Sequence, residues 1–146
     1  MGMDMLDDIL EDFDWENFKA LSKEICAINE NALSDEMVKL PHIYVQWYQL
    51  LARAKKRVDI RSGELSRISA ELNRECQAEY SNKGKKAKDL ESYVASHDSF
   101  VQCNRSAYEA REVSEMIKSV VNAISHKKDM LIQLNSDRRA ETKLYN

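Results

Sequence analysis

The sequence has few of the residues that turn or cross-link a chain: its 146 residues include three glycines, one proline and three cysteines. This composition favours a mostly helical, water-soluble protein with few tight turns. Cys26, Cys76 and Cys103 lie far apart and form no CxxC pair, so neither a disulfide framework nor a zinc site is indicated. We expect Cys76 and Cys103 to be small buried thiols on helices.

Long apolar runs are also missing. No stretch approaches the roughly 18 consecutive apolar residues that a membrane helix needs. The N-terminus is acidic, whereas a secretory signal begins with positive charge followed by an apolar segment. We therefore expect a cytoplasmic protein, in a host cell if a phage encodes it.

Catalytic motifs are absent as well. The sequence contains no glycine-rich phosphate loop, HExxH or GxSxG. His42, His97 and His126 are the only histidines, and none lies four residues from another or beside a pair of acids. Asp12 and Asp14 lack the glycine and further ligands of a calcium loop. The sequence predicts a protein that is not an enzyme and has no cofactor or metal site, with its histidines at surface or capping positions.

Charge is present in abundance, but it is distributed unevenly. The net charge of −3 combines an acidic head with a basic body. Residues 1–40 carry eleven carboxylates against three lysines, whereas residues 53–88 carry eleven Lys and Arg against five carboxylates. Such a division suggests different partners for the two ends.

The longest uninterrupted pattern runs from residue 41 to residue 80 and predicts one helix. Its apolar residues recur at steps of three, four and seven, which place them on one helical face. Pro41 suits the first turn of a helix, where its missing N–H is not needed. The apolar face comprises Trp47, Leu50, Leu51, Ala54, Val58, Leu65, Ile68, Leu72, Cys76 and Tyr80; the remaining surface carries Arg53, Lys55, Lys56, Arg57, Arg61, Arg67 and Arg74.

The acidic head allows two interpretations. Residues 1–14 combine acids with apolar residues at helical spacing, so the segment either packs on its own protein or folds against a partner protein. Asp14 is a plausible N-cap for a helix over 15–31, whose apolar residues form a clean stripe. Residues 32–40 are expected to be irregular.

The remaining chain predicts a second long helix. A turn at 81–86 contains Asn82 and Gly84, which favour the positive φ that follows a helix. A short helix over 88–95 and a long one over 100–134, capped by Asp98 or Ser99, come next. We therefore predict an all-α fold: a long antiparallel helical hairpin over 41–146, preceded by a segment over 1–40 with one amphipathic helix.

The apolar stripe in the C-terminal half of the second long helix is wider than one partner helix requires, and two helices alone bury little surface. We predict that it mediates assembly into a ring-like oligomer. The alternative is that the N-terminal helix covers it. The predicted interface comprises Ile117, Val120, Val121, Ile124, Met130, Leu131 and Leu134.

The basic stripe is the best candidate for a functional site. Lys and Arg along a helix face bind phosphate backbones without reading sequence, and aromatic side chains can stack on unpaired bases. Tyr44, Trp47, Tyr48 and Tyr80 are the nearby aromatics, although Trp47 fits the core better. The alternative for the stripe is a solvated helix face. The candidate nucleic-acid-binding residues are Arg53, Lys56, Arg57, Arg61, Arg74, Tyr80, Lys83, Lys85, Lys86 and Lys88.

Three sequence patterns follow one another between residues 43 and 142. A tyrosine/tryptophan start at 44–48 opens the basic helix, and an altered aromatic-Ser-Gly-basic turn at 79–84 closes it. Towards its end, at 120–132, the second helix has aliphatic and small residues, then basic residues, and then a Met-Ile-type sequence. Arg138 and Arg139 follow. In these patterns the chain resembles the UvsY recombination mediators of T4-type phages; the acidic head lies outside the resemblance.

The resemblance implies a single-stranded DNA-binding protein that assembles as a ring, a heptamer in the type member, through its C-terminal helices. Such proteins load a RecA-like recombinase onto strands covered by single-strand-binding protein. The family's Lys-x-Arg DNA-contact motif falls on Arg74 and Cys76, so only the first position keeps its charge. The first tyrosine of the following aromatic pair is Glu79 here. From their charge, we expect Lys83, Lys85, Lys86 and Lys88 to compensate for these two departures.

Two functions from different classes remain open. The first is a recombination mediator in phage DNA recombination, repair and recombination-dependent replication, with single-stranded DNA, a RecA-like recombinase, single-strand-binding protein and further copies of itself as partners. The second is a helical adaptor or coiled-coil scaffold whose basic face only aids solubility. Salt-sensitive binding to an oligonucleotide distinguishes them.

Overall fold

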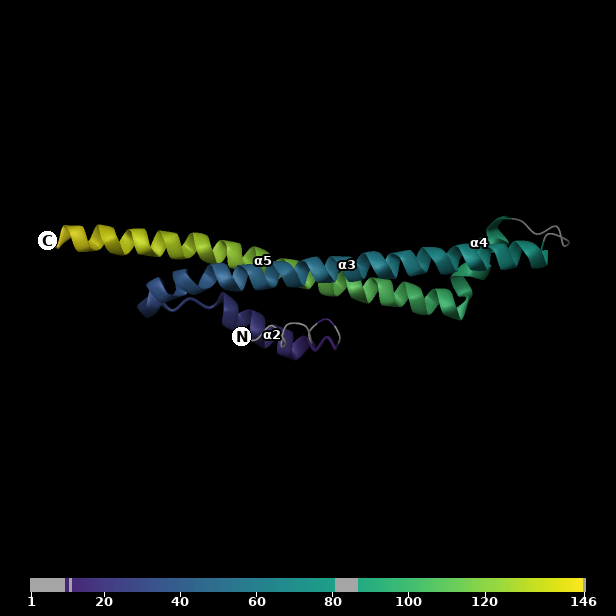
Figure 1. Ribbon diagram of the computed structural model, residues 1–146, viewed down its shortest axis with the longest axis horizontal. Helices are drawn as coiled ribbons and strands as arrows, with labels where there is room; N and C mark the ends of the chain where they lie inside the picture. Colours follow the sequence, from purple (N-terminus) through teal and green to yellow (C-terminus); the bar gives the residue numbers. More distant parts are fainter. Residues whose placement is uncertain (1–9, 11, 81–86, 146) are drawn as a thin grey trace. The chain divides into compact units, whose positions relative to one another are not determined.

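The chain folds into α-helices (Figure 1), as a computed structural model of residues 10, 12–80 and 87–145 shows. The described elements are α2 (Trp15–Cys26), the short 3₁₀ helix η1 (Glu30–Ala32), α3 (Leu33–Tyr80), α4 (Ala87–Ser96) and α5 (Asp98–Leu144). The predicted all-α hairpin of two long helices, α3 and α5, with a short helix before it, is confirmed. Within the described residues, no helix has the length and apolar character required to span a membrane.

Two compact units make up the chain. Unit 1 comprises Met1–Arg53 and Glu115–Asn146, and so contains α2, η1, the first part of α3 and the last part of α5. Unit 2 comprises Ala54–Ser114, and so contains the rest of α3, α4 and the first part of α5. In each unit, therefore, a stretch of α3 accompanies a stretch of α5.

Helix α2 begins where the sequence predicted and ends earlier. The Asp14 carboxylate accepts a hydrogen bond from the Glu16 N–H at 3.0 Å, which confirms Asp14 as the N-cap. The predicted helix over 15–31 was too long, because the chain becomes extended at Ala27. The Asn29 side chain then accepts a hydrogen bond from the Asn31 N–H and starts η1. Asparagine competes in this way with continued helix.

Helix α3 starts at Leu33, so the predicted irregular stretch over 32–40 and the predicted start at Pro41 were both wrong. Proline inside a helix removes one backbone hydrogen bond and costs about 3 kcal/mol. Burial offsets that cost, since Leu33 and Leu40 both lie in the core. Glu36, between them, forms an ion pair with α5. These tertiary contacts lie far apart in the sequence and override the local preference.

Helix α5 is longer than predicted at both ends. The His97 Nδ1 accepts a hydrogen bond from the Ser99 N–H at 3.3 Å, so the cap is His97 and neither Asp98 nor Ser99. This confirms the capping interpretation for one histidine. At the other end the helix continues ten residues past the predicted end at Leu134. The helical turns after Leu134 contact η1: Arg138 donates a hydrogen bond from Nη2 to the Glu30 carbonyl at 2.8 Å.

A buried lysine fastens α2 to α5 in unit 1. The Lys127 side chain is only 5% exposed, and its Nζ lies 2.6 Å from Oε2 of Glu36. The same Nζ donates to the carbonyls of Ile25 at 2.9 Å and Ala27 at 2.6 Å. Carbonyls at a helix C-terminus lack partners within the helix and carry partial negative charge. Lys127 therefore satisfies the end of α2 and fixes its position on α5.

The core of unit 1 is large and apolar. Trp47, Ile117, Ile124 and Leu131 are fully buried. The other buried apolar residues of this unit are Phe18, Leu21, Ile25, Leu33, Leu40, Leu50, Leu51, Val120 and Val121. α2, α3 and α5 all contribute to this set, so the N-terminal helix completes a core that two helices alone would leave thin.

Unit 2 has a seam of smaller side chains. Ala54, Ala107, Ala110 and Ser114 are buried between α3 and α5 together with larger apolar residues. Small residues let two helix backbones approach each other closely. Cys76 is fully buried, as predicted, whereas Cys103 is only partly buried.

Gly63 lies inside α3 on the exposed surface of unit 2, and a Cβ built there meets no atom within 4 Å. We expect Gly63→Ala to raise the free energy of unfolding by about 0.5–1 kcal/mol, because alanine loses less backbone entropy than glycine in a helix. Urea unfolding followed by circular dichroism measures this. A loss of stability would show that the glycine has another role.

Candidate functional site

The basic side chains of α3 in unit 2 divide according to the helix face on which they lie. Lys56, Arg67 and Arg74 are exposed, and at 100° per residue they project away from the buried face of the helix. We call these three residues the outer basic row. Lys56 and Arg74 are 18 residues apart, about 27 Å along a helix. Arg57 and Arg61 lie nearer the seam and are half-buried.

Two arginines of this stretch already have carboxylate partners. Arg61 Nη1 lies 3.1 Å from Glu64 Oε2, and Arg67 Nη1 lies 2.8 Å from Glu71 Oε1. Both ion pairs join residues three or four positions apart on the surface of one helix. Such a pair contributes about 0.5 kcal/mol or less to stability. A phosphate can replace the carboxylate at little cost. Lys56 and Arg74 form no ion pair with any residue that the structure describes.

The other predicted nucleic-acid contacts are Arg53, three residues before Lys56 on α3, and a group of residues in and next to the turn at 81–86. Arg53 is exposed, belongs to unit 1 and already has an interaction within the chain. Tyr80 ends α3 and Lys88 lies in α4, but their side chains are outside the described part of the structure. The predicted turn with Lys83, Lys85 and Lys86 lies wholly outside the described residues.

The aromatic residues at the start of α3 separate into core and surface. Trp47 is fully buried, as the sequence favoured, and its ring packs against Phe18 at a centroid distance of 6.0 Å. Tyr44 and Tyr48 are exposed, and their rings stack with centroids 6.0 Å apart and planes 25° apart. Unit 1 thus presents a pair of stacked tyrosine rings to solvent.

The predicted oligomer interface lies partly inside the chain. Met130 is exposed and Leu134 is half-buried. The other five members are buried within the single chain: Ile117, Val120, Val121, Ile124 and Leu131. In this conformation those five side chains expose little or no surface. Assembly through the C-terminal helix stays a prediction, and the residues that would carry it are the exposed ones.

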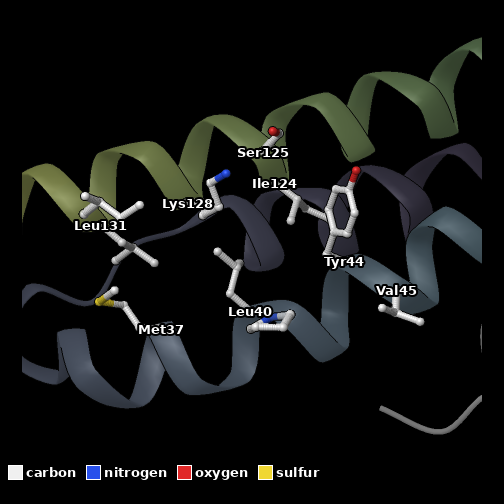
Figure 2. Close-up of a pocket in the computed structure, with 10 residues that line it drawn as sticks. Met37, Leu40, Tyr44, Val45, Ile124, Ser125, Lys128 and Leu131 are labelled. Atoms are coloured by element: carbon white, nitrogen blue, oxygen red, sulfur yellow. The ribbon is translucent and has the colours of Figure 1, made fainter.

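Unit 1 also contains a groove that the sequence did not predict. It has a volume of about 410 Å³ and lies between the start of α3 and the second half of α5 (Figure 2). Leu40, Ile124 and Leu131 are its buried lining residues. Figure 2 shows Tyr44 reaching from α3 toward α5, while Lys128 comes from α5. The lining comprises Met37, Leu40, Pro41, Tyr44, Val45, Ile124, Ser125, Lys128, Leu131 and Ile132.

Two signals in the sequence could have indicated these features. The C-terminal apolar stripe is wider than one partner helix needs, and part of its width now lines the groove. Lys127 falls between Ile124 and Leu131 at the spacing of the apolar stripe, which is an unusual place for a lysine. A charged residue on an apolar stripe indicates a buried partner, although not which one.

Among the described residues, no three or more His, Cys, Asp and Glu side chains form a group that could hold a metal ion. No protein-family model, curated protein or solved structure matches this chain.

Proposed function

We propose that this protein is a recombination mediator. It binds single-stranded DNA and helps to load a RecA-like recombinase onto strands covered by single-strand-binding protein, in phage DNA recombination, repair and recombination-dependent replication. The observation that carries the DNA-binding part is the outer basic row, in which Lys56, Arg67 and Arg74 project from one side of α3. The resemblance over residues 43–142 supports the mediator part.

Phosphate binding follows from the charges of this row. Each lysine or arginine that meets a phosphate releases a condensed counterion, so affinity depends steeply on salt. A helix surface with spaced cations suits a flexible strand that lies along it. Tyr44 and Tyr48 in unit 1 offer exposed rings of the kind on which unpaired bases stack. Stacking on such rings distinguishes a single strand from a duplex, whose bases are already stacked.

Self-assembly belongs to the same proposal. One outer basic row is a weak site, and a ring of several copies multiplies it through effective concentration. Met130 and Leu134 are the interface residues that remain accessible on α5. The protein acts by binding and assembly, with the acidic head in contact with the recombinase or the single-strand-binding protein. Strand exchange itself is left to the recombinase.

The second candidate function is a helical adaptor that binds proteins only. The groove favours it, because an apolar groove between two helices is a common docking site for a third helix. In that case the outer basic row serves solubility alone.

Fluorescence anisotropy of a labelled single-stranded oligonucleotide distinguishes the two functions. We expect binding at 50 mM salt that weakens about tenfold or more at 200 mM, and weaker binding to a duplex of the same length. Absence of binding at 50 mM salt would favour the adaptor. Equal affinity for the duplex would show that base stacking on Tyr44 and Tyr48 does not contribute to binding.

A further inference from the structure

The α3–α5 pair of unit 1 has two faces, and α2 covers one of them. Lys127 and Lys128 are consecutive on α5 and point in different directions. Lys127 reaches the carbonyls at the end of α2, whereas Lys128 lines the groove. In Figure 2, α2 lies behind the α3 and α5 ribbons that frame the groove. The groove is therefore on the face that α2 leaves open.

The chemistry of the groove defines what it can hold. Of its ten described lining residues, eight are apolar or aromatic, Lys128 is the one with a charge, and none is acidic. Val45 and Ile132 are each about half exposed, at 51% and 50%. Exposed apolar side chains around a groove indicate a binding surface. A fitting occupant has an apolar ridge beside negative charge, as an acidic amphipathic helix does.

Residues 1–12 have that chemistry in their sequence. They carry five carboxylates and no Lys or Arg. At 100° per residue, the apolar and acidic side chains would fall on separate arcs of a helix. The apolar arc comprises Met5, Leu6, Ile9 and Leu10, and the acidic arc comprises Asp4, Asp7, Asp8 and Glu11. The segment and the groove are thus complementary in both charge and apolar character.

We propose that the groove is a docking site for residues 1–12 of a second copy of this chain. A second copy is favoured because the chain's own α2 lies on the other face. Phe13 packs on Phe18 with ring centroids 5.3 Å apart, and Phe18 packs on Trp47. The chain therefore enters its own core on the α2 side. In the docked state the apolar arc lies against Val45 and Ile132, and the acidic arc meets Lys128.

The test is fluorescence anisotropy of a labelled peptide, MGMDMLDDILED, titrated with the full chain in the absence of DNA. We expect saturable binding, at least tenfold tighter than that of a scrambled peptide of the same composition. Val45→Asp in the full chain places a charge on the groove wall and should weaken binding more than tenfold. Val38→Asp is the matched control, because Val38 is an 80% exposed valine of α3 that does not line the groove, and it should leave binding unchanged.

Charge reversal provides a second and independent arm. Lys128→Glu should weaken binding about tenfold, since attraction becomes repulsion. A peptide with lysine at positions 4, 7 and 8 should bind Lys128→Glu more tightly than it binds the unmodified chain. Lys39→Glu changes an exposed lysine of α3 that does not line the groove, and it should have no effect.

Three results would overturn the proposal: no saturable binding, equal binding of the scrambled peptide, or unchanged binding to Val45→Asp. The last result would place the peptide elsewhere on the molecule. Because no nucleic acid is present, the outcome is independent of the proposed DNA binding.

Discussion

Replacing Lys127 by methionine is expected to lower the free energy of unfolding by about 3 kcal/mol. The substitution keeps the apolar stem but leaves the Glu36 carboxylate without its cation, together with the carbonyls of Ile25 and Ala27. Breaking a buried ion pair on one side costs about 3–5 kcal/mol. Glu36 is 25% exposed and regains some hydration, so the lower end of that range applies.

Lys128→Met is the matched control for this prediction. Lys128 is the next residue of α5 and is exposed, and among the described residues it forms one loose ion pair, with Asp129 at 3.7 Å. Its replacement should change stability by less than about 0.5 kcal/mol. Urea unfolding at a fixed protomer concentration measures both variants. A Lys127→Met chain as stable as Lys128→Met would contradict the fastening of α2 by Lys127.

Trp47→Ala is expected to cost about 3–5 kcal/mol, because it removes a fully buried indole and leaves a cavity in unit 1. Its aromatic contact with Phe18 is lost as well. The indole Nε1 has no hydrogen-bond partner in the described structure. A buried N–H without a partner costs about 1–3 kcal/mol. Trp47→Phe removes that penalty along with part of the packing, so its net cost should be about 1 kcal/mol or less.

The same urea experiment compares these variants with Trp15→Ala, which alters the exposed tryptophan of α2. We expect the order of destabilisation to be Trp47→Ala, then Trp15→Ala and Trp47→Phe close together. A loss for Trp47→Phe as large as for Trp47→Ala would show that the N–H has a partner. An unaffected Trp47→Ala chain would place this residue outside the core.

Local sequence signals predicted the parts of the fold that depend on local physics. The spacing of Trp47, Leu50 and Leu51 predicted the buried face of α3, and all three are buried. The Asp14 carboxylate predicted the start of α2. A cap and an apolar face are both properties of residues within a few turns of each other, so one stretch of sequence contains the whole signal.

Features that depend on contacts distant in sequence escaped prediction. The start of α3 at Leu33 depends on the Glu36–Lys127 pair, whose members are more than 90 residues apart. The end of α5 depends on Arg138 and its bond to the Glu30 carbonyl. Local preferences at Pro41 indicated a helix start there, and tertiary contacts outweighed them.

The candidate site shows the same limit. Composition identified the basic residues of α3, but their ion pairs depend on rotamers and neighbours, so the difference between Arg61 and Lys56 was not visible in the sequence. The groove required two helices to be placed side by side, and no single stretch encodes it. Burial of Ile117 and Ile124 likewise needed knowledge of which elements pack on α5.

If the outer basic row binds single-stranded DNA, the affinity must depend on salt through the phosphate contacts of its lysine and arginines. Anisotropy from 50 to 300 mM salt gives the slope of log K against log salt, which changes by about 0.7 for each phosphate contact on a single strand. We predict a slope shallower by about 1.4 for the Lys56→Ala/Arg74→Ala variant, and an unchanged slope for Lys23→Ala/Lys39→Ala, which removes the same charge from unit 1. Identical slopes for the two variants would show that the outer basic row does not bind the DNA.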